Sequence, residues 1–386
     1  MACNGPLSGI TVIDLSKVLA GPFCTMVMGD LGARIIKVEV PEHGDDSRHF
    51  GPFINDVSAY FASINRGKES IALNLKDSRD RNIFEKLLEH ADVLVENYRP
   101  GVMEKLGYGW DFLHSRYPSL IYAACSGFGH TGPYSLRAAY DMVVQGMGGI
   151  MSITGHKDCG PIRVGTSVGD ITAALYTTIG ISSALYKRTS TGAGAKIDVA
   201  MMDCQVSILE NALARYFSTG EIPGPLGSRH PSIAPFEVYR TKDGYIVIAA
   251  GNDVLFRKLA GALDRPDLLN NPHFATNPDR CSNVDELKGE IEKTLNLKDT
   301  AEWLSIVDGA GVPCGPLNNV KNVVEDPHVK ARNMIIETKQ NDGTVVRMAG
   351  NPVKISGYDD PCKRPCAPAL DADRSHILKE IGLTES

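Results

Sequence analysis

Short apolar runs alternate with amphipathic stretches along the first part of the chain. Brief runs rich in Val, Ile and Leu are typical of buried strands, whereas apolar residues three or four apart are typical of helices. This pattern predicts helices at 21–28, 80–90 and 101–116, and strands at 10–16, 33–40, 70–75, 92–96 and 120–125. Strands and helices in alternation predict an α/β fold, with a Rossmann-like large domain built on a parallel sheet.

The pattern is different in the second half. Helices are predicted at 138–152, 170–187 and 198–217, followed by a Pro- and Gly-rich stretch at 220–231 that is typical of a linker. Beyond it, apolar runs at 236–239 and 245–248 flank a Thr-Lys-Asp-Gly turn and predict a hairpin. Helices are also predicted at 253–263, 283–294 and 299–308, and strands at 345–348 and 353–355. We therefore predict a smaller α+β domain over 229–316.

Composition narrows the classes of function. The 386 residues are 43% hydrophobic and 22% charged, as in soluble globular proteins, and the net charge of −6 disfavours nucleic acid as a partner. The apolar run 171–186 is too short and too rich in Ser and Thr to span a membrane, and the N-terminus resembles no secretory signal. Nine scattered cysteines suit a reducing cytoplasm, and the pair Cys362 and Cys366 lacks further ligands, so we predict no metal site.

Asp170 is the most informative single residue. It follows Gly169 and precedes a long, weakly polar segment, which predicts a carboxylate at the start of a buried helix. The helix N-terminus is expected to keep such a carboxylate ionised and to offer backbone N–H groups to a developing oxyanion. Two roles fit this position: a helix N-cap, or a covalent nucleophile.

Two nucleotide-binding motifs are absent, and one hydrolase motif is present. The chain between 16 and 28 contains no G-x-G-x-x-G, and there is no P-loop, which disfavours a dinucleotide or nucleotide enzyme. Residues 165–169 match G-x-S-x-G, the nucleophile elbow of α/β-hydrolases, so a serine hydrolase with Ser167 is a second hypothesis. Basic residues also recur near predicted strand ends, where ligands of open α/β sheets bind: Lys17, Lys37, Lys76, Arg99, Lys105 and Arg137.

Several segments together resemble the class III CoA-transferase family. They are Asp-Leu-Ser-Lys-Val-Leu-Ala-Gly-Pro at 14–22, Asn-Arg-Gly-Lys-Glu-Ser at 65–70, Val-Glu-Asn-Tyr-Arg-Pro-Gly at 95–101, Ser-Gly-Phe-Gly-His-Thr-Gly-Pro at 126–133, and Gly-Val-Pro-Cys-Gly-Pro at 311–316. The resemblance covers nearly the whole chain. It implies an interlaced homodimer whose subunits have a large CoA-binding domain starting at 1–202, a linker at 203–228, a small domain at 229–316, and a return linker with the rest of the large domain at 317–386.

The resemblance also implies roles for residues. Asp170 matches the family's catalytic nucleophile. The acceptor acid is expected near His230, Gly251 and Asn252. The positions that match the family's CoA-binding residues are Lys17, Leu19, Ala20, Leu73, Asn74, Leu75, Lys76, Asn97, Tyr98, Arg99, Lys105, Arg137, Ala138, Ala139 and Tyr140. Where the family has Gln, this chain has Leu19, which removes a side-chain hydrogen bond.

The expected activity is transfer of CoA from acetyl-CoA or formyl-CoA to a small carboxylic acid, with no cofactor beyond the thioester. Segments 161–167, 230–236 and 350–357 are most similar to members that use acetyl-CoA and oxalate. A succinyl-CoA-dependent transfer to another dicarboxylate is the alternative. Racemase members carry His where this chain has Tyr140, and formyl-CoA transferases carry a run of glycines where this chain has Ala-Ala-Gly-Asn-Asp at 249–253, so both activities are less expected.

Overall fold

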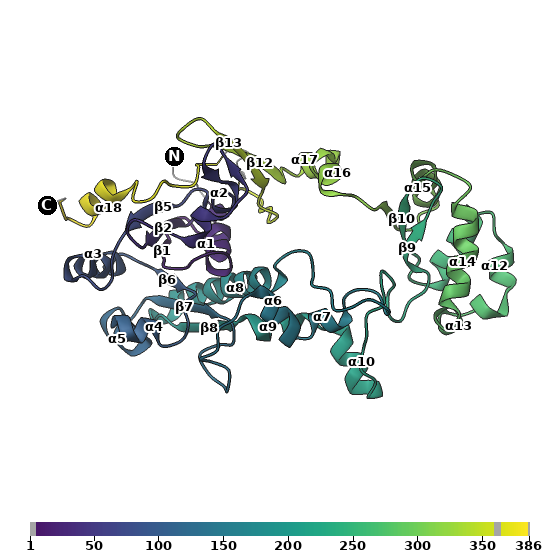
Figure 1. Ribbon diagram of the computed structural model, residues 1–386, viewed down its shortest axis with the longest axis horizontal. Helices are drawn as coiled ribbons and strands as arrows, with labels where there is room; N and C mark the ends of the chain where they lie inside the picture. Colours follow the sequence, from purple (N-terminus) through teal and green to yellow (C-terminus); the bar gives the residue numbers. More distant parts are fainter. Residues whose placement is uncertain (1–4, 359–363, 385–386) are drawn as a thin grey trace. The chain divides into compact units, whose positions relative to one another are not determined.

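The computed structural model of the protein describes residues 5–358 and 364–384. The chain forms two compact units. The first comprises Met1–Met151, Arg163–Thr219 and Pro327–Ser386, and the second comprises Ser152–Ile162 and Gly220–Asp326. Each unit is described by itself below, and Figure 1 shows the course of the chain through both.

The first unit is built on a six-stranded sheet in the order β5-β2-β1-β6-β7-β8, in which every pair is parallel. Its strands are β1 (Thr11–Asp14), β2 (Arg34–Glu39), β5 (Glu69–Ala72), β6 (Val93–Glu96), β7 (Ile121–Ser126) and β8 (Lys196–Ala200). After β1, the strands β2 and β5 follow one another on one side of it. The chain then returns, and β6, β7 and β8 follow one another on the other side of β1. The predicted parallel sheet is therefore confirmed, and the strand order reverses between β1 and β6, the position where open sheets bind ligands.

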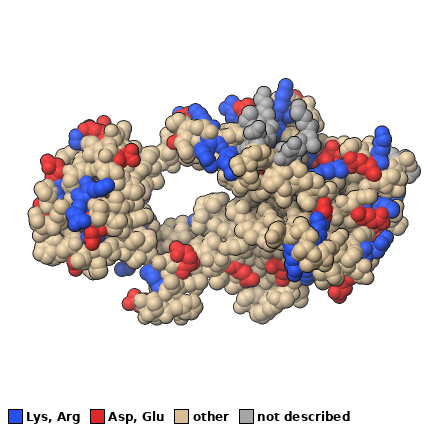
Figure 2. All heavy atoms as spheres, turned by 180° about the vertical axis from the view of Figure 1, so that it is seen from behind, with Lys and Arg blue, Asp and Glu red and all other residues tan. Residues whose placement is uncertain are grey.

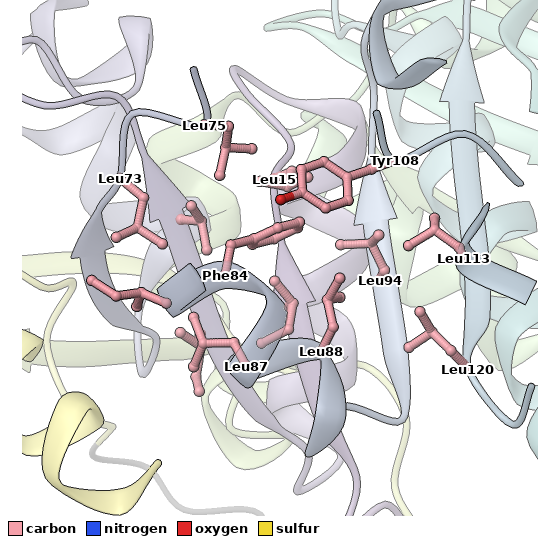
Figure 3. Close-up of a cluster of buried hydrophobic side chains, with 14 of the residues drawn as sticks. Leu15, Leu73, Leu75, Phe84, Leu87, Leu88, Leu94, Tyr108, Leu113 and Leu120 are labelled. Atoms are coloured by element: carbon pink, nitrogen blue, oxygen red, sulfur yellow. The ribbon is translucent and has the colours of Figure 1, made fainter. Parts of the chain in front are cut away.

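Helices cover both faces of this sheet because each strand alternates its apolar side chains between two cores. On one face, Cys24 and Met28 of one helix and Ile181 of another pack against Val12 and Val95. On the other face, Phe84 is central and meets the ring of Tyr108 edge-on at 4.9 Å, as Figure 3 shows. The first face is covered by α1 (Ala20–Asp30) and α8 (Val168–Thr191). The second face is covered by α3 (Ser78–Glu89), α4 (Val102–Leu106), α5 (Trp110–Arg116) and α18 (Arg374–Glu380).

Shorter elements complete the first unit. They are η1 (Asp46–His49), β3 (Phe53–Ile54), β4 (Val57–Ser58), α2 (Ala59–Asn65), α6 (Asp141–Met147), the first residues of α7 (Ile150–Ile153), α9 (Met201–Ile208), α10 (Asn211–Thr219), α17 (Pro327–Ala331), β12 (Ile335–Lys339) and β13 (Val345–Ala349). Two predictions were wrong here. The helix expected at 198–217 is a strand and two helices, because Lys196–Ala200 pairs with β7 in a regular parallel register. The strand expected at 353–355 is irregular chain.

The last part of the chain covers the outer edge of the sheet. The carboxylates of Asp373 and Asp371 accept hydrogen bonds of 2.8 and 2.7 Å from the backbone N–H groups of Ser70 and Ala72. Ile377 of α18 is fully buried in the core below β5. The free edge of β5 is therefore capped by residues about 300 positions further along the chain.

The second unit has a three-stranded antiparallel sheet in the order β11-β10-β9, with helices packed around it. Its core includes Tyr239, Phe256, Phe274, Ile291 and Trp303. The elements are β9 (Phe236–Arg240), β10 (Tyr245–Ala249), α11 (Asp253–Ala262), α12 (Asp267–Asn270), η2 (Pro272–Phe274), α13 (Asn277–Ser282), α14 (Val284–Leu295), α15 (Thr300–Gly309), β11 (Cys314–Pro316) and α16 (Val320–Glu325). The predicted hairpin and the α+β character are confirmed. The residues expected to form a linker at 203–228 include most of α9 and all of α10.

Charged side chains of both signs are interspersed on the face drawn in Figure 2. Across the described ranges, no helix is long and apolar enough to cross a membrane. The cysteines of these ranges, including Cys366, are unpaired thiols, and Cys362 lies outside the described residues. No group of three or more His, Cys, Asp and Glu side chains in the same ranges is arranged to hold a metal ion.

Candidate active site

Asp170 lies in the first turn of α8, two residues after Val168, with which the helix begins. The N-cap is Ser167, whose side chain makes no capping hydrogen bond. The interpretation of Asp170 as an N-cap is therefore wrong. Within residues 5–358 and 364–384, no group donates a hydrogen bond to its carboxylate, although the residue is half-buried. A half-buried carboxylate without a partner is costly to maintain for structure alone and is typical of a functional group.

The environment of Asp170 favours its neutral form. Burial raises the pKa of Asp170 to about 7, and the negative charge of Asp141 adds to the rise. The expectation that the helix N-terminus keeps Asp170 fully ionised is thus wrong, because desolvation and a like charge outweigh the helix dipole. A poorly solvated carboxylate near neutrality is a stronger nucleophile than one held in a salt bridge.

Asp141 accepts from the backbone N–H of Gly169 at the start of α8, where we expected N–H groups to be available to an oxyanion. It lies in the first turn of α6, is 7% exposed, and its Oδ1 accepts a 2.8 Å hydrogen bond from the backbone N–H of Gly169. The other oxygen, Oδ2, accepts a 2.8 Å hydrogen bond from the side-chain amide of Gln145. A Cβ atom on residue 169 would lie 3.0 Å from Asp141 Oδ1 and 2.7 Å from Val144 Cγ2, so this close approach requires glycine.

The serine hydrolase hypothesis is not supported by the fold. A nucleophile elbow needs a strand that runs directly into the turn. Here residues 160–167 contain no strand, and Ser167 merely precedes α8. The side-chain amide of Gln145 instead ties this loop to α6, since its Oε1 accepts a 2.9 Å hydrogen bond from the N–H of Val164.

A cavity of about 450 Å³ opens at the carboxyl ends of β1, β2, β5 and β6. Its walls include Leu15, which follows β1, and Val40, which follows β2. The cavity brings together five of the residues that the family resemblance assigns to CoA: Leu73, Asn74, Leu75, Lys76 and Tyr98. A ligand-sized cavity at the point where the strand order reverses is the expected position of a binding site in such a sheet.

The loop between β1 and α1 connects this cavity with Asp170. Leu15 lines the cavity, and Val18 and Leu19 pack in one apolar cluster with Ile171, the residue after Asp170. Asn97 holds the loop from the β6 side: its Oδ1 accepts a 2.7 Å hydrogen bond from the N–H of Lys17, and its Nδ2 donates one of 2.7 Å to the Lys17 carbonyl. The predicted residues Lys17, Leu19, Ala20 and Asn97 thus lie together between cavity and carboxylate.

Buried charged side chains at the end of β1 fix the start of the loop between β1 and α1. Asp14 at the end of β1 accepts hydrogen bonds from the N–H of Ser16 at 2.9 Å and from Thr25 Oγ1 at 2.7 Å, and Lys68 Nζ lies 3.0 Å from it. Burial would raise the pKa of Asp14, but Lys68 and Lys37 hold that pKa well below its ordinary value. Burial also lowers the pKa of Lys68 to about 8. Such a fully hydrogen-bonded charge network rigidifies the chain around it.

Several cations assigned to CoA are unpaired. The side chains of Lys17, Lys76, Arg99 and Lys105 make no hydrogen bond or ion pair with any residue of the described ranges. Lys76, Arg99 and Lys105 are exposed and Lys17 is half-buried. By contrast, Arg34, Arg48 and Arg66 of the same unit are all held in ion pairs. Unpaired cations beside a cavity are available to phosphate groups.

The predicted segment from Arg137 to Tyr140 precedes α6. The guanidinium of Arg137 lies 4.8 Å from the ring centroid of Tyr134. A Cβ atom on Gly127 would lie only 2.3 Å from Ala139 Cβ, so this glycine permits the close packing of the segment on the loop after β7. Ala138 is exposed, and Tyr140 is the N-cap residue of α6 and is 79% exposed.

The residues expected at the acceptor acid lie in the second unit. His230 donates its backbone N–H to the Phe236 carbonyl at 2.9 Å, and its ring lies 5.3 Å from that of Phe236 in a tilted arrangement. Gly251 is exposed, and Asn252 caps α11 by accepting a 2.9 Å hydrogen bond from the N–H of Leu255. Their assignment to the acceptor stays a prediction.

Sequence reasoning missed the groups that shape this site. Asp141, Asp45 and Glu96 are buried carboxylates on three different elements or loops. Glu96 lies in a segment that resembles the family, but no local pattern predicted that these three carboxylates are buried. One signal was present: Gly169 directly precedes Asp170, and a glycine inside a helix indicates a close neighbour.

Comparison with known proteins identifies the family. The model of CoA-transferase family III matches residues 7–374. The chain belongs to CoA-transferase family III. An acetyl-CoA:oxalate CoA-transferase from Acetobacter aceti is 49% identical over 99% of this chain and 97% of its own length. A human succinyl-CoA:glutarate CoA-transferase is 39% identical over 97% of this chain and 86% of its own length.

A solved structure agrees with the fold. The crystal structure of a CAIB/BAIF family protein from Brucella suis superposes with a TM-score of 0.87 at 39% identity, covering 98% of this chain and 100% of that one. The mixed α/β architecture and the enzyme class predicted from the sequence are therefore confirmed. This family III chain is a CoA-transferase.

Proposed function

We propose that the enzyme transfers CoA from acetyl-CoA to oxalate, with Asp170 as the covalent nucleophile. The observation that carries the proposal is the partly buried Asp170 carboxylate, which has no hydrogen-bond donor in the described ranges and a pKa raised to about 7. The substrate pair is supported by the 49% identity with the acetyl-CoA:oxalate enzyme, compared with 39% for the human succinyl-CoA:glutarate enzyme. Transfer from succinyl-CoA to another dicarboxylate is the second candidate.

The chemistry follows from the reactivity of a thioester. The Asp170 carboxylate attacks the acyl carbonyl carbon, the C–S bond breaks, and CoA leaves as a thiolate with a mixed anhydride left on the enzyme. The thiolate then attacks the aspartyl carbonyl carbon, which releases acetate and forms an aspartyl-CoA thioester. An oxalate carboxylate attacks the aspartyl carbonyl carbon, the C–S bond breaks, and a second mixed anhydride and free CoA thiolate are formed. The thiolate then attacks the oxalyl carbonyl carbon, which gives oxalyl-CoA and releases the Asp170 carboxylate. Every step exchanges one acyl bond for another, so no cofactor beyond the CoA substrate is required.

CoA would lie along the carboxyl edge of the sheet. The cavity at Leu73–Lys76 and Tyr98 suits the adenosine end, and the unpaired Lys17, Arg99 and Lys105 suit the phosphates. The loop from Lys17 to Ala20 would lead the pantetheine arm to Asp170. The acceptor acid is assigned to His230, Gly251 and Asn252 by the family resemblance alone. Water has to be kept from the anhydride, which it otherwise hydrolyses.

We also propose that the enzyme is an interlaced homodimer that works in the cytoplasm, where its unpaired thiols stay reduced. The first unit exposes large apolar side chains on two of its helices, with Ile179 and Tyr186 of α8 at 59% and 82% exposure and Phe217 of α10 at 79%. Such side chains in water favour a protein interface. Light scattering of the purified protein measures the molar mass and should give that of a dimer. The molar mass of a monomer at micromolar protein concentration would contradict the proposed homodimer.

The test of function combines two measurements. A matrix of acyl-CoA donors and carboxylic acids, with products identified by mass, should give oxalyl-CoA from acetyl-CoA. Incubation with acetyl-CoA and hydroxylamine should then convert Asp170 to a hydroxamate, which peptide mass spectrometry locates. An adduct on a cysteine would contradict the carboxylate mechanism, whereas efficient transfer only to other dicarboxylates would change the substrate and leave the role of Asp170 intact.

A further inference from the structure

Val18 has a backbone conformation that its side chain disfavours. Its φ angle is +64°, in the left-handed region. For a β-branched residue this region is a genuine outlier, because Cβ and both γ carbons crowd the backbone. Val18 lies between Lys17 and Leu19, in the loop that connects the cavity with Asp170. Strain at such a place persists only where surrounding contacts impose it.

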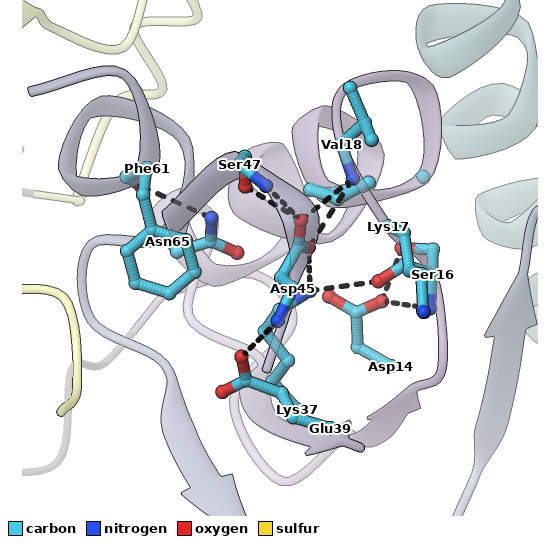
Figure 4. Close-up of polar contacts among 12 residues, drawn as sticks. Asp14, Ser16, Lys17, Val18, Lys37, Glu39, Asp45, Ser47, Phe61 and Asn65 are labelled. Atoms are coloured by element: carbon cyan, nitrogen blue, oxygen red, sulfur yellow. Dashed lines mark hydrogen bonds and ion pairs between the residues drawn. The ribbon is translucent and has the colours of Figure 1, made fainter. Parts of the chain in front are cut away.

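The contact that imposes it comes from Asp45. The N–H of Val18 donates to Asp45 Oδ1 at 3.1 Å and to Oδ2 at 3.3 Å. Asp45 is itself 1% exposed and fixed: Lys37 Nζ lies 2.8 Å from Oδ2, and Ser47 donates its N–H and its hydroxyl to Oδ1 at 2.9 and 2.7 Å. Figure 4 shows Asp45 at the centre of these contacts, directly below Val18.

The neighbours of Val18 are held at the same time. Lys37 Nζ donates to the carbonyl of Ser16 at 2.8 Å, in addition to its ion pair with Asp45. Asn97 holds both backbone groups of Lys17. The loop is therefore fixed at three successive residues, and Asp45 supplies the contact at the strained one. Burial would lower the pKa of Lys37, but Asp14 and Asp45 raise it, so the amine stays charged and keeps Asp45 ionised.

We propose that Asp45 is a positioning residue for acyl-CoA, which it serves by holding Val18 in the left-handed conformation. This inference rests on the proposed function, because it requires acyl-CoA to bind along this loop. If Asp45 no longer accepts from the Val18 N–H, the strain is released when φ turns negative. That rotation turns the peptide planes on both sides and moves Lys17 and Leu19 away from the thioester path.

The test is a rescue experiment, since glycine adopts a positive φ without strain and alanine does not. In Asp45→Ala, which removes the acceptor of the Val18 N–H, we expect the KM for acetyl-CoA to rise about tenfold while kcat changes less than about twofold, as for a lost ground-state contact. Adding Val18→Gly in that background should lower this KM again by about fivefold. Adding Val18→Ala, which removes the same branched side chain, should not.

Outcomes separate the alternatives. Thermal midpoints are measured for every variant, so that kinetics compare folded proteins only. If Asp45→Ala does not fold, Asp45→Asn replaces it: this variant keeps one acceptor oxygen but loses the second one and the charge that pairs with Lys37, so the rise in KM should be smaller and Val18→Gly should rescue it in the same way. An unchanged KM in the first variant, or equal KM values with glycine and alanine at position 18, would overturn the role of Asp45. A wild-type protein that transfers no CoA would instead refute the proposed function.

Discussion

The backbone N–H of Gly169 donates a 2.8 Å hydrogen bond to Asp141, one residue before the proposed nucleophile Asp170. A second carboxylate therefore occupies the positive end of α8. Its charge stabilises the helix N-terminus and at the same time raises the pKa of Asp170. One contact thus fixes the position of the nucleophile and shifts its titration toward neutrality.

Replacing Asp141 should change the pH profile. Asp170 reacts as a carboxylate, so kcat/KM should fall as pH decreases through its pKa of about 7. Asp141→Asn removes the like charge, and we expect the acidic limb to move down by about one pH unit. The asparagine oxygen can still accept from Gly169, so the fold is retained. A profile of kcat/KM from pH 5 to 9 for both proteins measures the shift, and coincident acidic limbs would contradict the coupling.

Removing the carboxylate of Asp170 should abolish transfer and stabilise the fold. Its pKa is about 7 in the folded chain, above the ordinary value of 3.8. The folded state therefore binds the proton more tightly, and its stability falls as pH rises between these values. Asp170→Asn should lower kcat by at least about a thousandfold and raise the thermal midpoint at pH 8 by a few degrees. At pH 4 the midpoint should hardly differ from that of the wild type.

Ser167→Ala is the matched control for this substitution. Ser167 begins the same helix but its side chain makes no capping hydrogen bond. We expect its activity to remain within about threefold of the wild type. An inactive Ser167→Ala together with an active Asp170→Asn would reinstate the hydrolase hypothesis.

The unpaired cations should act on CoA affinity. Arg99→Ala and Lys105→Ala should each raise the KM for acyl-CoA by about three- to tenfold with little effect on the KM for the acceptor, because phosphates are bound alike in ground and transition states. Lys86→Ala is the control, since Lys86 is an exposed cation on α3 that pairs with Glu89 at 2.8 Å. Initial rates with each substrate varied in turn provide the comparison, and a loss confined to kcat would refute the assignment.

The enzyme should not exchange the α-proton of a 2-methylacyl-CoA. Racemase members have His before the residue that matches Asp141, whereas this chain has Tyr140, a phenol that is 79% exposed. This chain therefore lacks, at that position, the imidazole that is the usual general base at neutral pH. Mass spectrometry after incubation in deuterated water tests this, and deuterium incorporation at a rate comparable to transfer would show racemase chemistry.

The fold was more predictable from the sequence than the site. Strands β1, β2, β6 and β7 follow from apolar runs alone, since each is buried on both faces. The strand β8 was missed because its residues Lys196 and Asp198 alternate with apolar ones in a short segment that leads directly into α9. Periodicity cannot separate such a strand from the first turn of a helix.

The chemistry of the site depends on contacts between distant residues. Asp170 was identified from its own surroundings and the family resemblance. The partners that set its pKa and the loop geometry, Asp141 and Asp45, lie 29 and 125 residues away in sequence, as their numbers show. The expected effect of the helix dipole was correct in sign for an isolated helix, but burial and a neighbouring carboxylate reversed the outcome.

The capping of β5 by Asp371 and Asp373 affects how the chain is made. During synthesis, residues 69–72 leave the ribosome roughly 300 residues before the segment that covers them. A nascent chain therefore exposes an uncapped strand edge and part of an apolar core while the whole second unit is being translated, and such edges pair readily with other chains. The edge of β5 is consequently capped only after the second unit has been translated, and a stop codon that removes the chain from residue 371 onward would leave every proposed catalytic residue in place while exposing this edge to other chains.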